Sequence, residues 1–139
     1  MADAANLNLE AALNAAFLGR LHLLDETLHQ ALAAGNDPGM LIGMASRHAV
    51  MLHRARLDFD RGAPRDGAIE KASRRAYIFT RKEILASQLD LWTAQGLARA
   101  VELLGAALQD ARKDARLAEA IVSRCFWSIA SAARRGRGR

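Results

Sequence analysis

The sequence predicts an all-α protein, a single helical bundle of about six or seven helices. Alanine and leucine supply much of the 51% hydrophobic content, and both favour helix, whereas aromatic residues make up only 5%. Apolar residues recur at spacings of three and four along most of the chain, and no strong pair of strand-like segments stands out. A chain of 139 residues has the length of one domain. We expect this domain at residues 1–133, followed by a flexible arginine and glycine tail at 134–139.

Composition limits the class of protein further. A single cysteine excludes a disulfide framework and fits a reducing compartment. The first ten residues, MADAANLNLE, lack the basic start of a signal peptide. The apolar runs are far shorter than the roughly 18 to 20 residues that span a bilayer. We therefore expect a cytoplasmic protein without a membrane partner.

Two helices are predicted in the first part of the chain. The first covers about Leu7–Phe17, and Gly19 interrupts it. The second is followed by Gly35, where a C-terminal cap is expected. The apolar face of this second helix consists of Leu21, Leu24, Leu28 and Leu32.

A long third helix is predicted over Pro38–Asp60. Asp37 has the side chain of an N-cap, and proline suits the first helical position. An apolar seam follows one face of this helix. Its members are Leu41, Ala45, His48, Leu52, Ala55 and Phe59. The turn RGAPRDG ends the helix, and a short helix around Asp66–Ser73 is predicted next.

Residues 73–92, SRRAYIFTRKEILASQLDLW, interrupt the alanine and leucine pattern and allow two interpretations. A basic run interleaved with aromatic residues is typical of a nucleic-acid platform. The same run also fits a buried strut between two helices. Capping signals favour the strut, because Thr80 and Glu83 have the spacing of a capping box, and Phe79 and Ile84 that of a hydrophobic staple.

The strut interpretation assigns structural roles to several residues. We expect Phe79, Thr80 and Glu83 to fix the start of a helix, and its buried face to continue through Leu89 and Trp92. The basic side chains around them would then form a solvated rim.

Two further helices complete the predicted bundle. One covers about Ala94–Ala111 after Thr93 as its N-cap, and the other covers about Asp114–Ala133. The apolar stripe of the first consists of Leu97, Val101, Leu104 and Leu108, and that of the second of Ile121, Val122, Cys125 and Ile129.

Motifs for catalysis and cofactor binding are missing from the sequence. It contains no P-loop, and no GxGxxG segment follows a strand. His22 and His29 are too far apart for the usual helical pair of metal ligands, and no acid completes a site. We expect His48 to be a hydrogen-bonded core histidine and Cys125 a small buried hydrophobe. The sequence therefore predicts no enzyme activity, no metal and no cofactor.

Basic residues form two groups that a partner could contact. The net charge is +5, and four of these charges come from arginines in the last six residues, RRGRGR. The candidate contacts for a protein partner or a nucleic acid are Arg74, Arg75, Arg81, Lys82, Arg134 and Arg135. A solvated surface is the alternative for both groups.

Several motifs follow one another in a characteristic order. A long helix containing SRHAVMLHRAR precedes AYIFTRKEILASQLDLW, then LARAVELLGAALQDARKD, then a closing apolar helix. From about residue 8 to 133 this order resembles the C-terminal domain of the delta subunit of the bacterial DNA polymerase III clamp loader. The matching positions are His48, Leu52, His53, Arg54, Ile78, Phe79, Arg81, Lys82, Gln88, Leu89 and Trp92, with looser matches at Asp110 and Lys113. The family commonly has proline where this chain has Arg74, Arg75 and Ala76.

The resemblance implies a collar domain, one of a ring of helical domains that holds five clamp-loader subunits together. Its partners would be the delta-prime and the tau or gamma subunits, and it would contact DNA only through the assembly. The clamp-opening and ATPase-like domains of the family have no counterpart in these 139 residues. The isolated domain would be monomeric and without catalysis of its own. The alternative is a small helical nucleic-acid-binding protein that uses its basic tail and its basic loop.

Overall fold

The described part of the chain is a bundle of seven α-helices. The computed structural model describes residues 2–137, with side chains from residue 8 onward. The elements are α1 (Ala2–Leu18), α2 (Leu21–Ala33), α3 (Pro38–Asp60), α4 (Arg65–Arg75), α5 (Lys82–Leu91), α6 (Ala94–Lys113), the 3-10 turn η1 (Ala115–Leu117) and α7 (Ala118–Arg137). None of the described residues lies in a strand, and the predicted all-α class is confirmed. No helix in residues 2–137 is long and apolar enough to cross a membrane.

Helix boundaries agree with the sequence where a capping side chain marks them. α3 covers the predicted range, and the Asp37 carboxylate accepts from the Met40 N–H at 2.9 Å. The Thr93 hydroxyl accepts from the Gly96 N–H at 2.9 Å, which confirms the predicted start of α6. α7 starts later than predicted, because the Asp114 carboxylate accepts from the Arg116 N–H and caps η1 instead.

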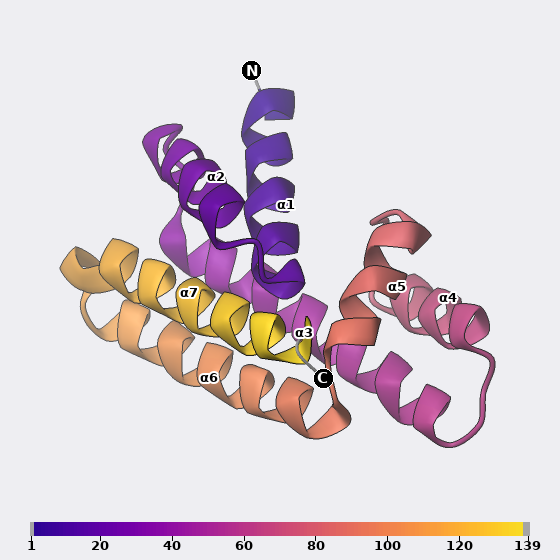
Figure 1. Ribbon diagram of the computed structural model, residues 1–139. Coiled ribbons are helices and arrows are strands. Elements are labelled where there is room, and N and C mark those ends of the chain that lie inside the picture. The colour runs from indigo at the N-terminus through magenta and orange to yellow at the C-terminus, as the bar shows by residue number, and fades with distance from the viewer. Residues whose placement is uncertain (1, 138–139) are drawn as a thin grey trace.

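The helices pack around α3 and α7 (Figure 1). α6 contacts α3 along its length and forms an antiparallel pair with α7. The α1–α2 hairpin packs on α7, so that α7 lies between this hairpin and α6. α4 and α5 pack against each other near one end of α3. The segment between α4 and α5 is therefore held at the edge of the bundle.

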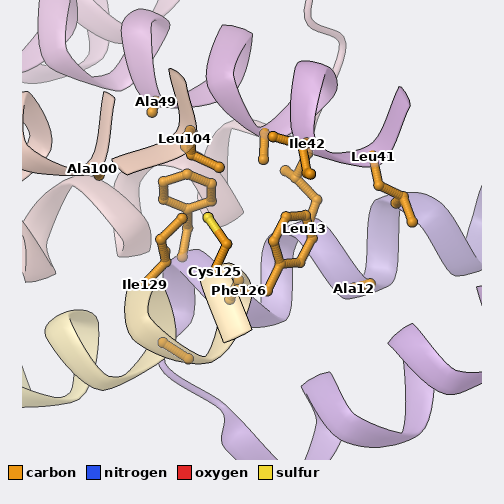
Figure 2. Close-up of a cluster of buried hydrophobic side chains, with 14 of the residues drawn as sticks. Ala12, Leu13, Leu41, Ile42, Ala49, Ala100, Leu104, Cys125, Phe126 and Ile129 are labelled. Atoms are coloured by element: carbon orange, nitrogen blue, oxygen red, sulfur yellow. The ribbon is translucent and has the colours of Figure 1, made fainter. Parts of the chain in front are cut away.

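Leucine, alanine and two phenylalanines fill the core. Phe17 of α1 and Phe126 of α7 are fully buried. Figure 2 shows side chains of α1, α3, α6 and α7 converging, among them Leu13, Ile42 and Leu104. Buried alanines on the same helices let the backbones approach closely, which maintains the dense packing of a protein interior.

The end of α7 docks on the turn between α1 and α2. Gly19 in this turn has φ +72°, and a Cβ added there would lie 2.8 Å from the Arg134 backbone nitrogen. The Arg137 guanidinium donates to the Leu18 carbonyl at 2.6 Å. The expectation of a flexible tail is therefore wrong for residues 134–137, which continue α7, while residues 138–139 lie outside the described part.

A buried polar network connects three helices through side chains. His48 of α3 is 2% exposed, and its Nε2 lies 2.6 Å from the Gln88 Oε1 of α5. The Gln88 Nε2 donates to the Asn14 Oδ1 of α1 at 2.9 Å. Because Gln88 presents its amide nitrogen to Asn14, its oxygen accepts from His48, whose Nε2 then carries the proton. The predicted hydrogen-bonded core histidine is confirmed.

Trp92 extends this network at the end of α5. Its indole N–H donates to the Phe17 carbonyl at 3.0 Å, and its ring centroid lies 5.9 Å from that of Phe17. The Phe17 ring in turn lies 4.9 Å from the His48 ring. Trp92 is 4% exposed and Leu89 is fully buried, so the predicted burial of both residues is confirmed.

We expect Trp92→Ala to lower the free energy of unfolding by about 3 to 5 kcal/mol, because it removes a large buried ring and leaves the Phe17 carbonyl unpaired. Denaturant unfolding measures the change. Trp127→Ala is the matched control, since Trp127 is 42% exposed, and should cost about 1 kcal/mol or less. Equal losses for the two variants would contradict the packing described for Trp92.

Acid should destabilise the fold through His48. Burial lowers the pKa of His48 from 6.5 to about 4, and the hydrogen bond with Gln88 only partly offsets this effect. Between these two pH values the unfolded chain binds a proton that the folded protein does not, so stability falls as the pH falls. We expect the stability of the wild type relative to His48→Gln to decrease by about 3 kcal/mol from pH 6.5 to pH 4. A difference that does not change with pH would contradict this role of His48.

Candidate functional site

The connection between α4 and α5 presents aromatic side chains to solvent. α4 ends in a Schellman motif, in which the Tyr77 N–H donates to the Arg74 carbonyl and the Ile78 N–H to the Ser73 carbonyl. Tyr77 occupies the left-handed position of this motif with φ +55°. Glycine is the usual residue there, because a side chain in this conformation costs about 1 to 2 kcal/mol.

Ile78 anchors the connection, and its neighbours point outward. Ile78 is partly buried against the core, whereas Tyr77 is 76% exposed and Phe79 88% exposed. Of these three consecutive residues only Ile78 packs against the core, and both aromatic neighbours are left in solvent. The predicted burial of Phe79, and with it the staple to Ile84, is therefore wrong.

The predicted capping box is also wrong. α5 begins at Lys82 with Arg81 at the N-cap position, so Thr80 lies outside the helix. The Glu83 carboxylate lies 3.6 Å from the Arg81 Nε and is exposed. A capping box requires Thr80 at the N-cap position, but Thr80 lies one residue before that position. The core contact of Ile78, rather than a cap at Thr80, accordingly fixes how the chain enters α5.

Basic residues flank the two exposed aromatic residues along the chain. The Arg74 guanidinium pairs with Glu70, and the Lys82 ammonium lies 3.4 Å from the same carboxylate. We call this region the aromatic–basic surface, and it consists of Arg74, Arg75, Tyr77, Phe79, Arg81 and Lys82, all of them exposed. The structure thus brings Arg74 and Lys82 together at Glu70, and Arg75 and Arg81 lie exposed on the same connection.

Arginines take the place of a helix-ending residue at the C-terminal end of α4. α4 continues through Arg74 and Arg75 and ends at Ala76 as its C-cap. A proline within the last turn would remove a helical hydrogen bond and disfavour this continuation. The two arginines therefore lengthen α4 and add two cations beside Tyr77.

Arg47 of α3 also holds this segment, although no motif in the sequence indicates such a role. Its guanidinium donates to the Ala76 carbonyl at 2.6 Å and so binds the C-terminus of α4. A cavity of about 160 Å³ lies beside it, bordered by both exposed rings and by His48. In the sequence Arg47 resembles any exposed residue of a long helix. It gains a partner only because the end of α4 lies against α3 in the fold.

The second basic group lies elsewhere. Arg134 and Arg135 belong to the last turns of α7. Arg135 lines a cavity together with Trp92 and Thr93, which follow the C-terminal end of α5, whereas the aromatic–basic surface precedes its N-terminal end. The structure therefore does not join the two predicted basic groups into one surface.

An apolar groove follows the α6–α7 pair. Two adjoining cavities of about 590 and 350 Å³ share Leu103 and Ser128 and extend to Leu117. Leu103 is 40% exposed and Leu117 54% exposed. We call this feature the α6–α7 groove. The sequence predicts the buried faces of α6 and α7 but not this groove, because Leu103 falls beside the buried stripe of α6 and Leu117 lies in η1.

The described residues show where the remaining candidate ligands lie. His22 and His29 are exposed on α2. No group of three or more histidine, cysteine, aspartate or glutamate side chains in the described part is arranged to hold a metal ion. Cys125 is buried, and desolvation raises the pKa of its thiol to about 12. At neutral pH the thiol is therefore protonated and a poor nucleophile.

Comparisons of the chain with family models, with curated proteins and with solved structures found no match.

Removal of the Tyr77 side chain should not cost stability. Tyr77→Gly relieves the strained left-handed conformation and loses little packing, because the ring is 76% exposed. We expect the free energy of unfolding to stay the same or to rise by up to about 1 kcal/mol, and Phe79→Ala to lower it by less than about 1 kcal/mol. Chemical denaturation of the two variants tests this, and a loss above 2 kcal/mol in either would contradict the exposed placement.

Proposed function

We propose that this chain is a collar domain of the delta subunit of the bacterial DNA polymerase III clamp loader. The observation that carries the proposal is that the fold brings several of the positions that match the family together in the core. His48 and Gln88, 40 positions apart, form a buried hydrogen bond. Leu52, Leu89 and Trp92 are buried in the same core cluster. Five of the matching positions therefore share one core, whereas Arg54, Phe79, Arg81 and Lys82 are exposed.

In this proposal the domain works by holding other chains. Its neighbours are the delta-prime and the tau or gamma subunits, and its contribution to loading the sliding clamp is assembly without catalysis. Each collar domain in a ring meets two neighbours through different faces, an arrangement that closes without self-association. The isolated domain is then a monomer, and DNA is reached through the assembled loader.

The α6–α7 groove is the contact face that the geometry favours. It joins two adjoining cavities whose apolar lining comes mainly from leucine, alanine and isoleucine of two antiparallel helices. An amphipathic helix of a neighbouring subunit can lay its apolar side into such a groove. Arg99, Arg124 and Arg135 border it together with Glu102 and Asp110, so its rim is polar. An apolar centre with a polar rim is the usual anatomy of a protein–protein interface.

We expect this chain to co-elute with the collar fragment of delta-prime, or of tau or gamma, from the same organism at micromolar concentration and moderate salt. The contact should bury about 800 Å² on each partner, as stable interfaces do. Size-exclusion chromatography of the mixed fragments measures the complex. The absence of a complex with every one of these fragments would contradict the proposal.

A pair of matched variants locates the contact. Leu103→Glu puts a charge into the α6–α7 groove and should weaken the complex about tenfold or more. Leu23→Glu is the control, because Leu23 of α2 is 38% exposed against 40% for Leu103, and should leave the affinity unchanged. Equal weakening by both substitutions would show that the groove is not the contact face.

A further inference from the structure

The aromatic–basic surface carries two aromatic rings that take no part in the core. Tyr77 and Phe79 are 76% and 88% exposed, in a chain with few aromatic residues. Tyr77 also occupies a left-handed position that glycine fills at no steric cost. Strain of this kind at a solvated side chain indicates a function, because neither packing nor backbone geometry favours tyrosine there.

We propose that this surface binds single-stranded nucleic acid, with bases stacked on Tyr77 and Phe79 and phosphates held by the surrounding cations. This activity goes beyond the proposed assembly role and does not depend on it. Stacking needs an open aromatic face and a base whose own face is free. A ring that is 88% exposed presents such a face, and only a single strand offers unstacked bases.

The charge around the rings matches a phosphate backbone. Residues 70–83 contain five cationic and two acidic side chains, a net charge of +3. Three of the cations, Arg74, Arg81 and Lys82, pair with exposed carboxylates. Such surface pairs contribute roughly 0 to 1 kcal/mol each, so a phosphate can displace the carboxylate. The arginines offer the fork of donors that binds phosphate oxygens in pairs.

The backbone of this surface is held in place before any ligand arrives. Arg47 donates to the Ala76 carbonyl, and the Schellman motif fixes Tyr77 and Ile78. Ile78 is packed against the core between the two rings. Since this backbone is already ordered, binding requires little further ordering of it, and each stacked base should contribute most of its stacking energy.

Fluorescence anisotropy of the full chain tests the proposal. The probes are a labelled oligothymidylate of roughly 15 nucleotides, an oligouridylate of equal length, and a duplex of the same length. We expect both single strands to bind more tightly than the duplex. The affinity should fall linearly with salt on logarithmic axes between roughly 50 and 200 mM. Failure to bind either single strand, or tighter binding of the duplex, would overturn the proposal.

Variants separate the stacking contacts from the phosphate contacts. Tyr77→Gly and Phe79→Ala should each weaken single-strand binding about tenfold and leave the salt slope unchanged. Arg75→Ala should reduce the salt slope by about 1. Trp127→Ala, an exposed aromatic of α7, and Arg54→Ala, an exposed cation of α3, are the controls and should change neither quantity.

Two outcomes would contradict the proposal: nucleic-acid binding at another site, or a different role for the aromatic–basic surface. If Arg135→Ala abolishes binding and the Tyr77 and Phe79 variants do not weaken it, the end of α7 is the nucleic-acid site and the proposal is wrong. If those two variants abolish co-elution with a collar fragment and leave oligonucleotide affinity unchanged, the surface is a protein contact and the proposal is equally overturned. The Leu103→Glu result is independent of both outcomes, so failure of this proposal is distinguishable from failure of the assembly role.

Discussion

The hydrogen bonds among Asn14, Gln88 and His48 are the constraint on which the arrangement of the bundle depends. Each buried polar group must keep its partner, because an unpaired one costs about 1 to 3 kcal/mol. Alanine and leucine faces alone allow neighbouring helices to slide or rotate with small losses, whereas a chain of donors and acceptors fits one register. This network and the Trp92 bond to the Phe17 carbonyl orient α5 against α1 and α3. The position of α5 then determines where the segment that precedes it emerges.

The sequence predicts the helices well and the connection before α5 poorly, for one physical reason. The N-caps Asp37 and Thr93 act on their own helices, so their effect is visible in a short stretch of sequence. The burial of His48 and Trp92 follows from long apolar stripes that average over many residues. At residues 77–79, however, each of three neighbouring aromatic or aliphatic side chains could pack against the core, and local spacing does not show which of them does. Ile78 packs against the core, and the two aromatic rings beside it are therefore left exposed.

The candidate sites, too, could be predicted where they depend on neighbouring residues and could not where they depend on distant segments. The basic residues of the aromatic–basic surface could be identified from the sequence because they adjoin the aromatic run. Arg47 and the α6–α7 groove could not, because both depend on how distant segments meet. The two surfaces lie toward opposite ends of α5, so an occupant of one need not exclude an occupant of the other. Under the proposed assembly role, the domain would hold a neighbouring chain in the groove and leave the exposed rings free.

The docking of α7 onto the turn after α1 has a consequence for synthesis on the ribosome. Arg137 and the Leu18 carbonyl that it contacts are 119 positions apart. α7 also supplies Phe126 to a core that α1 lines, so the α1–α2 hairpin waits with its apolar face uncovered while the rest of the chain is translated. Local helices form early, but contacts this distant in sequence form only after α7 has emerged. Part of the apolar surface of the nascent hairpin therefore stays uncovered until α7 has been translated.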